Sequence, residues 1–171
     1  MWYAIQVYTG KEQETIDLCR KCIEGVDYRI ENPKLERSRK YLGSWHKECS
    51  IMFPGYVFVV TDDIDAFRMA SKKVPRITKV LGAEDQAIPL TEEEVETLHK
   101  LVNDEYVVEL SKGIKVGDSI AVTDGPLKGM EALIIKVDRH KRTAAIRVPM
   151  MGREIETVVG LEVLVDEPKK N

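Results

Sequence analysis

The sequence contains no apolar run close to the ~20 residues that a membrane-spanning helix needs, and its N-terminus lacks the basic-then-apolar pattern of a secretory signal. Only three residues are cysteine, an odd number that cannot pair completely, which argues against a secreted disulfide scaffold. The shares of apolar and charged residues, 43% and 32%, are ordinary for a folded protein. We therefore expect a cytoplasmic protein of one domain or two small ones, with no membrane partner.

The sequence also lacks a recognisable catalytic constellation. His99 and His140 have no nucleophile or paired carboxylate at a spacing that would indicate acid–base or nucleophilic chemistry. We therefore predict that the protein is not an enzyme and requires no cofactor.

One pattern is reminiscent of a metal site. Cys19-x-x-Cys22 followed by His46-x-x-Cys49 offers four nitrogen and sulfur ligands at paired spacing. However, Cys19 shares an apolar helix face with Ile16, and free cysteine is a good small core residue. We interpret these cysteines as structural and expect no bound metal.

Charge is distributed unevenly along the chain. Residues 1–110 hold 15 Lys and Arg against 20 Asp and Glu, a net charge of −5, whereas residues 111–171 hold 11 against 9, a net charge of +2. The bulk field of the first part disfavours nucleic acid, while the second part is mildly basic. The basic residues of the second part are clustered. Their local arrangement therefore says more about binding of nucleic acid than the net charge does.

The most informative stretch spans residues 51–60. Its second half, from Tyr56, is a run of β-branched and aromatic residues typical of a strand buried on both faces. Pro54 and Gly55 predict a bend where this strand begins. The bend would place Phe53 and Tyr56 on either side of a corner, where their rings can be presented to a partner; ordinary core is the more common use of such a run.

The remaining N-terminal pattern alternates strands with helices. Thr9 with Glu12, and Thr91 with Glu94, have the spacing of capping boxes. This order favours an α+β fold, with helices packed on a mainly antiparallel sheet as an α/β sandwich. The predicted strands are residues 2–8, 28–30 and 77–81, and the predicted helices are residues 12–25, 61–73 and 89–102.

A polar, basic segment at residues 37–45 precedes the central strand. Its cations include Arg37, Arg39 and Lys40, and its isolated aromatic residues include Trp45. The pattern predicts an exposed hairpin or loop, and it leaves open whether this segment is merely solvated or forms a contact surface.

The pattern changes in the last third of the chain. Five short strands with turn signals and no helix indicate a small β-barrel. The predicted strands are residues 119–122, 132–137, 144–148, 155–159 and 161–165. We therefore predict a first domain at residues 1–106, a linker at 107–113 and a five-stranded barrel domain at 114–171.

Several short motifs occur in a fixed order along the chain. In the first domain they are Trp2-Tyr3, Thr9-Gly10-Lys11-Glu12, Phe53-Pro54-Gly55-Tyr56-Val57, Val74-Pro75-Arg76 and Pro89-Leu90-Thr91. In the second they are Val116-Gly117-Asp118, Asp124-Gly125-Pro126-Leu127 and Gly152-Arg153. With these motifs the chain resembles the NusG family of transcription elongation factors over nearly its whole length, which implies an NGN-type first domain followed by a KOW-type β-barrel.

The resemblance implies a function. In this family the first domain binds the clamp helices of the large catalytic subunit of RNA polymerase and leaves the KOW domain free for a second partner. The resemblance also implies a monomeric elongation factor. Aromatic anchors are common hot spots of protein–protein interfaces such as the one with polymerase. The residues that it assigns to the polymerase-facing patch are Tyr3, Tyr8, Phe53, Pro54 and Tyr56.

The KOW motif departs from the family pattern. Leu127 stands where housekeeping members have Phe, and Met130 and Ala132 stand where they have another aromatic residue and then glycine. Those aromatic residues are the family's handle for the termination factor Rho and for a small-subunit ribosomal protein. The departures put these two partners in doubt for this chain.

A basic set occupies this part of the chain instead. Its members are Lys128, Lys136, Arg139, His140, Lys141, Arg142, Arg147 and Arg153. Residues 138–142 are expected to form a tip between adjacent strands, and arginine suits phosphates and guanine edges. This looks like the specialised antitermination paralogue LoaP, which implies an RNA hairpin as second partner, although a solvated turn is the ordinary use of a charge run.

Two alternatives stay open at this point. One is a general elongation or termination factor that couples polymerase to Rho or the ribosome. The other is a ribosome- or RNA-associated binding module that never contacts polymerase.

Overall fold

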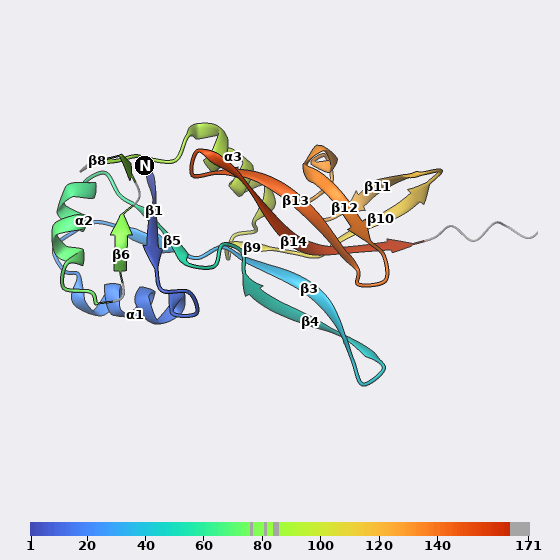
Figure 1. The fold of residues 1–171 in the computed structure, drawn as a ribbon, viewed down its shortest axis with the longest axis horizontal. Coiled ribbons are helices and arrows are strands. Elements are labelled where there is room, and N and C mark those ends of the chain that lie inside the picture. The colour runs from blue at the N-terminus through green and yellow to red at the C-terminus, as the bar shows by residue number, and fades with distance from the viewer. Residues whose placement is uncertain (76, 81, 84–85, 165–171) are drawn as a thin grey trace, which may run out of the picture.

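The computed structural model describes residues 1–75, 77–80, 82–83 and 86–164. The molecule is elongated, with an N-terminal sheet and two helices at one end and a curled C-terminal sheet toward the other (Figure 1). A long hairpin projects from its middle (Figure 1). Within the described ranges, no helix is long and apolar enough to cross a membrane.

The N-terminal sheet has four antiparallel strands in the spatial order β2-β5-β1-β6. Their bounds are β1 (Trp2–Val7), β2 (Arg29–Glu31), β5 (Tyr56–Val60) and β6 (Ile77–Val80). Val57, Phe58 and Val59 in β5 are fully buried, so the prediction of a strand covered on both faces is confirmed.

The two faces of this sheet pack against different partners, because side chains alternate along a strand. Ile5 and Val57 join the cluster formed with the first two helices. Trp2, Ala4 and Phe58 point to the other face and join a second cluster, which includes the third helix and the C-terminal half. The second face is therefore an internal surface of the molecule.

Two of the α-helices in the described residues begin as their sequences predict. Helix α3 (Glu92–Leu101) starts at a capping box, in which Thr91 Oγ1 accepts from Glu94 N at 3.2 Å and Glu94 Oε1 accepts from Thr91 N at 2.9 Å. Asp63 caps the N-terminus of helix α2 (Ile64–Ser71). Its carboxylate accepts a hydrogen bond of 3.0 Å from Ala66 N. Both helices are confirmed, with tighter bounds than expected.

The capping box predicted at Thr9 is wrong. Helix α1 (Glu12–Cys22) has no side-chain cap at its start. The Glu12 carboxylate is instead 1% exposed and accepts hydrogen bonds from Gly10 N at 3.1 Å and from Gly55 N at 2.8 Å. Glu12 thus ties the turn after β1 to the corner before β5, 43 positions along the chain, a contact that no local pattern encodes.

The segment at residues 37–45 belongs to a hairpin. The sequence predicted either a hairpin or a loop for this segment. Its strands are β3 (Lys34–Tyr41) and β4 (Ser44–Ile51), and β9 (Val107–Val108) pairs in parallel with β3. A short pair, β7 (Gly82–Ala83) and β8 (Gln86–Ala87), precedes α3. Because β9 lies within the expected linker at residues 107–113, that segment contains regular strand.

The C-terminal sheet has five strands in the order β11-β10-β14-β13-β12. Their bounds are β10 (Ser111–Val116), β11 (Ser119–Asp124), β12 (Ile134–Asp138), β13 (Thr143–Met150) and β14 (Arg153–Leu164), with a short 3₁₀ helix at Glu131–Leu133. The α+β class and the number of strands are confirmed, but the division differs. The strands expected at 155–159 and 161–165 are one continuous β14, and β10 begins within the expected linker.

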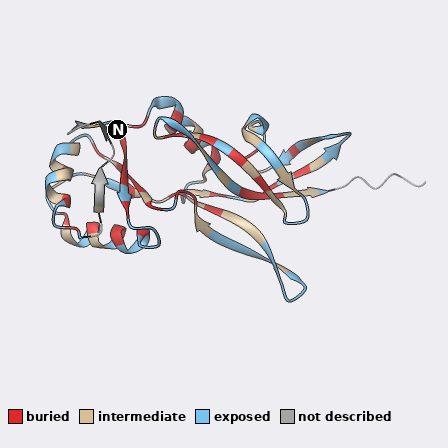
Figure 2. Ribbon diagram, viewed as in Figure 1, coloured by how far each residue is buried: buried red, intermediate tan, exposed pale blue. Residues whose placement is uncertain are grey.

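One apolar cluster contains buried side chains from both halves of the chain. Figure 2 shows buried residues along the ribbon in both halves. Its N-terminal members include Trp2, Leu35, Met52, Phe53, Phe58, Leu98 and Leu101. Its C-terminal members include Leu127, Ile146, Val148, Met150, Val159 and Leu161. Strands β13 and β14 therefore help to close the core of the N-terminal half as well as their own.

The cysteines are free and spread through the fold. Cys19 is buried, Cys22 is half-buried and Cys49 is exposed. Burial, with a smaller contribution from Cys22, raises the pKa of the Cys19 thiol to about 11, so this thiol is protonated at neutral pH. Among the described residues, no group of three or more His, Cys, Asp or Glu is placed to hold a metal ion.

Replacing Glu12 with alanine should lower the free energy of unfolding by about 1–3 kcal/mol, because the buried N–H of Gly55 loses its acceptor. Urea denaturation followed by circular dichroism measures the change. Glu14→Ala is the matched control on the same helix, since its ion pair with Lys11 is exposed and should contribute less than about 1 kcal/mol. Equal losses in the two variants would contradict the role given to Glu12.

Candidate functional site

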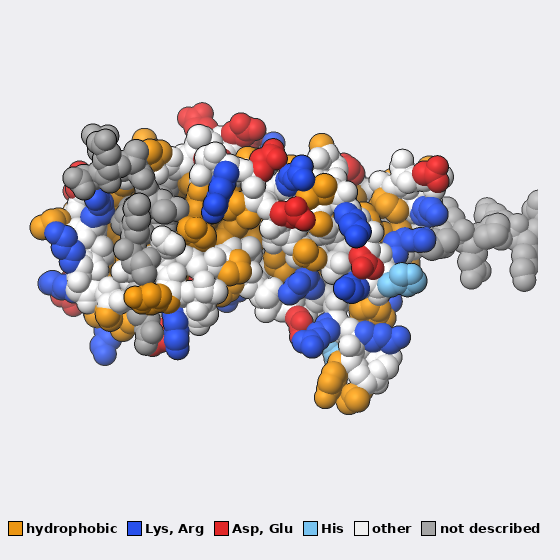
Figure 3. All heavy atoms as spheres, viewed as in Figure 1, with side chains coloured by type: hydrophobic (Ala, Val, Ile, Leu, Met, Phe, Trp, Pro, Cys, Tyr) orange, Lys and Arg blue, Asp and Glu red, His pale blue; other side chains and the backbone are white. Residues whose placement is uncertain are grey.

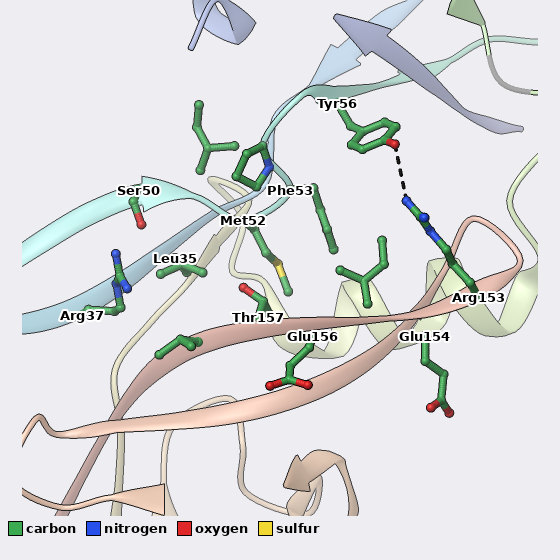
Figure 4. Close-up of a pocket in the computed structure, with 14 residues that line it drawn as sticks. Leu35, Arg37, Ser50, Met52, Phe53, Tyr56, Arg153, Glu154, Glu156 and Thr157 are labelled. Atoms are coloured by element: carbon green, nitrogen blue, oxygen red, sulfur yellow. Dashed lines mark hydrogen bonds between the residues drawn. The ribbon is translucent and has the colours of Figure 1, made fainter. Parts of the chain in front are cut away.

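The first candidate surface is the aromatic corner, defined as Phe53, Pro54 and Tyr56. A groove of about 600 Å³ separates it from β14 (Figure 4). One wall of the groove comes from the corner and the adjoining ends of β3 and β4, and the other from residues 153–158 of β14. The corner is therefore turned toward the C-terminal sheet.

The corner is only partly accessible in this arrangement. Phe53 is 2% exposed, and its ring packs edge-on against Phe58 with centroids 5.6 Å apart. Tyr56 is half-buried, and its hydroxyl accepts a hydrogen bond from Arg153 Nη2 at 3.4 Å (Figure 4). Pro54 is exposed. Of the two interpretations of the corner, presentation to a partner or ordinary core, Phe53 fits the second here, because the shared core covers its ring.

The other two residues of the expected patch lie elsewhere. Tyr3 is paired with Val59 across the β1–β5 ladder, so it points to the sheet face opposite that of Phe58. It is buried, and burial raises the pKa of its hydroxyl. Tyr8 follows β1 and is 56% exposed. The structure thus brings together the three residues of the corner but not all five.

Backbone contacts fix the C-terminal sheet over the corner. Gly152 N donates to Glu94 Oε2 at 3.1 Å, so the carboxylate that caps α3 also holds the turn between β13 and β14. Farther along β14, a Cβ added at Gly160 would lie 2.8 Å from the Glu36 carbonyl oxygen and would overlap the Leu110 side chain. Only glycine allows β14 to approach β3 this closely.

The second candidate surface is the basic turn, defined as residues 139–142, which joins β12 to β13. Asp138 Oδ1 accepts a hydrogen bond from Lys141 N at 3.0 Å, and this bond is the largest cause of the lowered pKa of Asp138. Arg142 adopts φ +54° as the turn closes. Arg139, His140 and Lys141 are exposed. The expectation of a tip between adjacent strands is confirmed.

The other members of the predicted basic set lie away from the basic turn. Arg147 is exposed on β13 opposite Glu156, and Arg153 lies at the far end of the β13–β14 hairpin beside Tyr56. Because β13 has eight residues, about 25 Å separates that end from the basic turn. Lys128 is exposed in the turn after β11, and Lys136 is exposed on β12.

The Arg142 side chain contacts two other segments of the chain. Its guanidinium lies 4.1 Å from the centroid of the Trp45 ring and pairs with Glu162 at 3.6 Å. Trp45 belongs to β4, so this contact joins the hairpin to the basic turn. The sequence signal was an isolated tryptophan in a polar segment, but its partner, almost 100 positions away, could not be read from it.

Two of the three residues at the KOW departures, Leu127 and Met130, pack on the core, whereas Ala132 is exposed. Leu127 is fully buried, and its N–H donates to Ser111 Oγ at 3.0 Å. Met130 is half-buried and packs on the same cluster. Leu127 and Met130 therefore do not form an exposed apolar contact surface in this arrangement.

The chain is similar to known proteins in sequence and in fold. A family model described as "Transcription termination factor nusG" matches residues 1–99. The chain is 30% identical to the transcription termination/antitermination protein NusG of Synechocystis sp., over 94% of this chain and 85% of that protein. It is 26% identical to the protein of the same name from Halalkalibacterium halodurans, over 94% of each. A solved structure described as "Domain interaction in Thermotoga maritima NusG" is similar in fold, with TM-score 0.53, 24% identity and coverage of 93% of this chain and 92% of that chain.

Gly160→Ala should loosen the packing of β14 on β3, because the added methyl group meets the Glu36 carbonyl. We expect the free energy of unfolding to fall by about 1–3 kcal/mol, as for other overpacked sites. Amide hydrogen exchange should accelerate in β3 and around Phe53. Val158→Ala, at a side chain 38% exposed on the same strand, is the control and should leave exchange at Phe53 unchanged. Unchanged exchange in both variants would mean that Gly160 does not set this contact.

Proposed function

Because the chain belongs to the NusG family of transcription termination/antitermination factors, we propose that it acts as a processive antitermination factor in the cytoplasm. Residues 1–106 bind RNA polymerase, at the clamp helices of its large catalytic subunit, through the aromatic corner. Residues 114–171 form the KOW domain, which binds an RNA hairpin in the transcript through the basic turn. This is the mode of action of the LoaP paralogue that the sequence resembles.

The observation that carries the RNA-binding part is the basic turn itself. It places Arg139, His140 and Lys141 side by side at the exposed end of a two-stranded tip. Such a tip is narrow enough to enter an RNA major groove that a bulge or loop has widened. The major groove of regular duplex RNA is too deep and narrow for side chains to reach the bases. Arginine and lysine supply phosphate contacts, and the arginine fork can also read guanine.

The aromatic corner supports the proposal that the chain binds polymerase, provided that its covered ring becomes exposed. Phe53 can serve as an interface anchor only after β14 has moved away from it, because its ring is covered in the packed arrangement. Re-exposing one such ring costs about 1.5–3 kcal/mol. Polymerase would then compete with the C-terminal sheet for the same apolar face, and only the separated form would bind.

A general factor that couples polymerase to Rho or the ribosome is the second candidate, because the relatives are named termination/antitermination proteins. The buried Leu127 and the half-buried Met130 favour it less. Affinity capture with the full chain distinguishes the two, using purified polymerase, Rho and ribosomes as prey. Capture of polymerase alone supports the first candidate, and capture of ribosomes without polymerase would indicate a ribosome-associated binding module.

Two substitutions on either side of the groove should change polymerase affinity in opposite directions. Tyr56→Ala removes a contact of the corner and should weaken binding by about 2 kcal/mol, the cost of a hot spot. Arg153→Ala removes only the hydrogen bond that clasps Tyr56, so binding should be unchanged or tighter. Fluorescence titration with core polymerase measures both, after circular dichroism has shown that both variants are folded. Equal losses would place Arg153 in the interface, and no loss for Tyr56→Ala would remove the corner from it.

Lys141→Ala tests the RNA-binding surface. If Lys141 contacts phosphate, the change should weaken binding of a bulged RNA hairpin and of unrelated RNAs alike, and it should lower the salt slope by about one unit. Arg139→Ala should cost ~1–3 kcal/mol and reduce the preference for the right hairpin if this arginine reads a base. Lys115→Ala, exposed on β10, is the control. Wild-type affinity in both turn variants would show that the basic turn is only solvated.

A further inference from the structure

A cleft of about 370 Å³ lies between the β3–β4 hairpin and the basic turn. The hairpin contributes Arg37, Arg39 and Lys40 to one side, and the basic turn contributes His140 and Lys141 to the other. Figure 3 shows Lys and Arg side chains gathered where the hairpin meets the C-terminal sheet, with a histidine beside them. Residues from opposite ends of the sequence thus line one basic cleft.

The cleft holds more cations than carboxylates, and the Asp138 carboxylate interacts with Lys141 and His140 on its turn side. One carboxylate, Glu48, lines it and pairs with Arg39 at 3.2 Å, a contact in which both side chains are well exposed. Arg37 and Lys40 form no ion pair with any carboxylate in the described part of the chain. Such cations repel one another unless an anion or solvent counter-ions occupy the space between them. The cleft therefore favours a polyanion.

The two sides of the cleft are held at a fixed separation. Arg142 stacks on Trp45 from the hairpin and pairs with Glu162 of β14, so one guanidinium bridges both sides. Gly160 brings β14 against the backbone of β3 at Glu36 and Arg37. Arg142 therefore holds the two sides of the cleft in position. Arg37, Lys40 and Lys141 can then contact a ligand.

We infer that the hairpin is the second half of the RNA site, and that an RNA strand passes through the cleft with phosphates contacted from both sides. This inference rests on the proposed RNA binding and extends it to residues of the N-terminal half. The cleft is continuous with the basic turn already assigned to RNA, and its guanidinium and ammonium groups suit phosphates. A strand held from two sides would give affinity that neither side supplies alone.

The test uses the full chain, because both halves form the cleft. A fluorescein-labelled, bulged RNA hairpin is titrated at several potassium chloride concentrations with wild type, Arg37→Ala, Lys40→Ala and Lys141→Ala. Each variant should bind about fivefold more weakly near physiological salt and lower the salt slope by about one unit, as expected for one lost phosphate contact. Lys21→Ala, exposed on α1 at the other end of the molecule, removes the same charge and should change neither quantity.

A spectroscopic readout locates the RNA independently. Trp45 lines the cleft, whereas Trp2 is buried in the core, so RNA should quench the emission of the wild type and not that of Trp45→Phe. Circular dichroism of every variant excludes misfolding as the cause of a loss.

The outcomes separate this inference from the proposed function. Wild-type affinity in Arg37→Ala and Lys40→Ala, with a loss in Lys141→Ala, would overturn the inference and leave RNA binding by the basic turn standing. No binding of RNA by the wild type would overturn both. A loss of polymerase affinity in the hairpin variants, with RNA affinity intact, would make the cleft a protein-binding surface and would also overturn the inference.

Discussion

Burial of one apolar face, shared by both halves of the chain, is the interaction on which the rest of the structure depends. Trp2, Phe53 and Phe58 present this face from the N-terminal sheet and its corner, and β13 and β14 cover it. The same packing sets the groove beside Tyr56, brings the β13–β14 turn to Glu94, and places the basic turn next to the β3–β4 hairpin. Without it, both candidate surfaces would have different neighbours.

The shared face links the two proposed activities. A polymerase that binds the aromatic corner must displace β14, and displacement also separates the two sides of the basic cleft. RNA bound through the cleft would then stabilise the packed form, whereas polymerase would stabilise the separated form. Any ligand shifts such an equilibrium only by its difference in affinity for the two forms. Each ligand would therefore weaken the binding of the other.

Local patterns predicted the elements well, and distant contacts escaped them. The Thr91–Glu94 capping box, the buried strand from Tyr56 and the tip at residues 138–142 were all predicted, because each depends on neighbours a few positions away. The role of Glu12 was misassigned, since its decisive partner is Gly55 N. The covering of Phe53 and the stacking of Arg142 on Trp45 could not be predicted, because both depend on how the halves pack. Arg147 and Arg153 lie apart from the basic turn because they occupy other positions along the β13–β14 hairpin.

The most direct measurement of this packing is backbone ¹⁵N relaxation of the free, full-length protein. If the shared core holds in solution, amides of residues 1–106 and of residues 114–164 should give one common rotational correlation time, that of a single elongated body. Two distinct and shorter correlation times, one for each half, would contradict the account. The halves would then tumble independently, Phe53 would be accessible to a partner, and the basic cleft would not exist before binding.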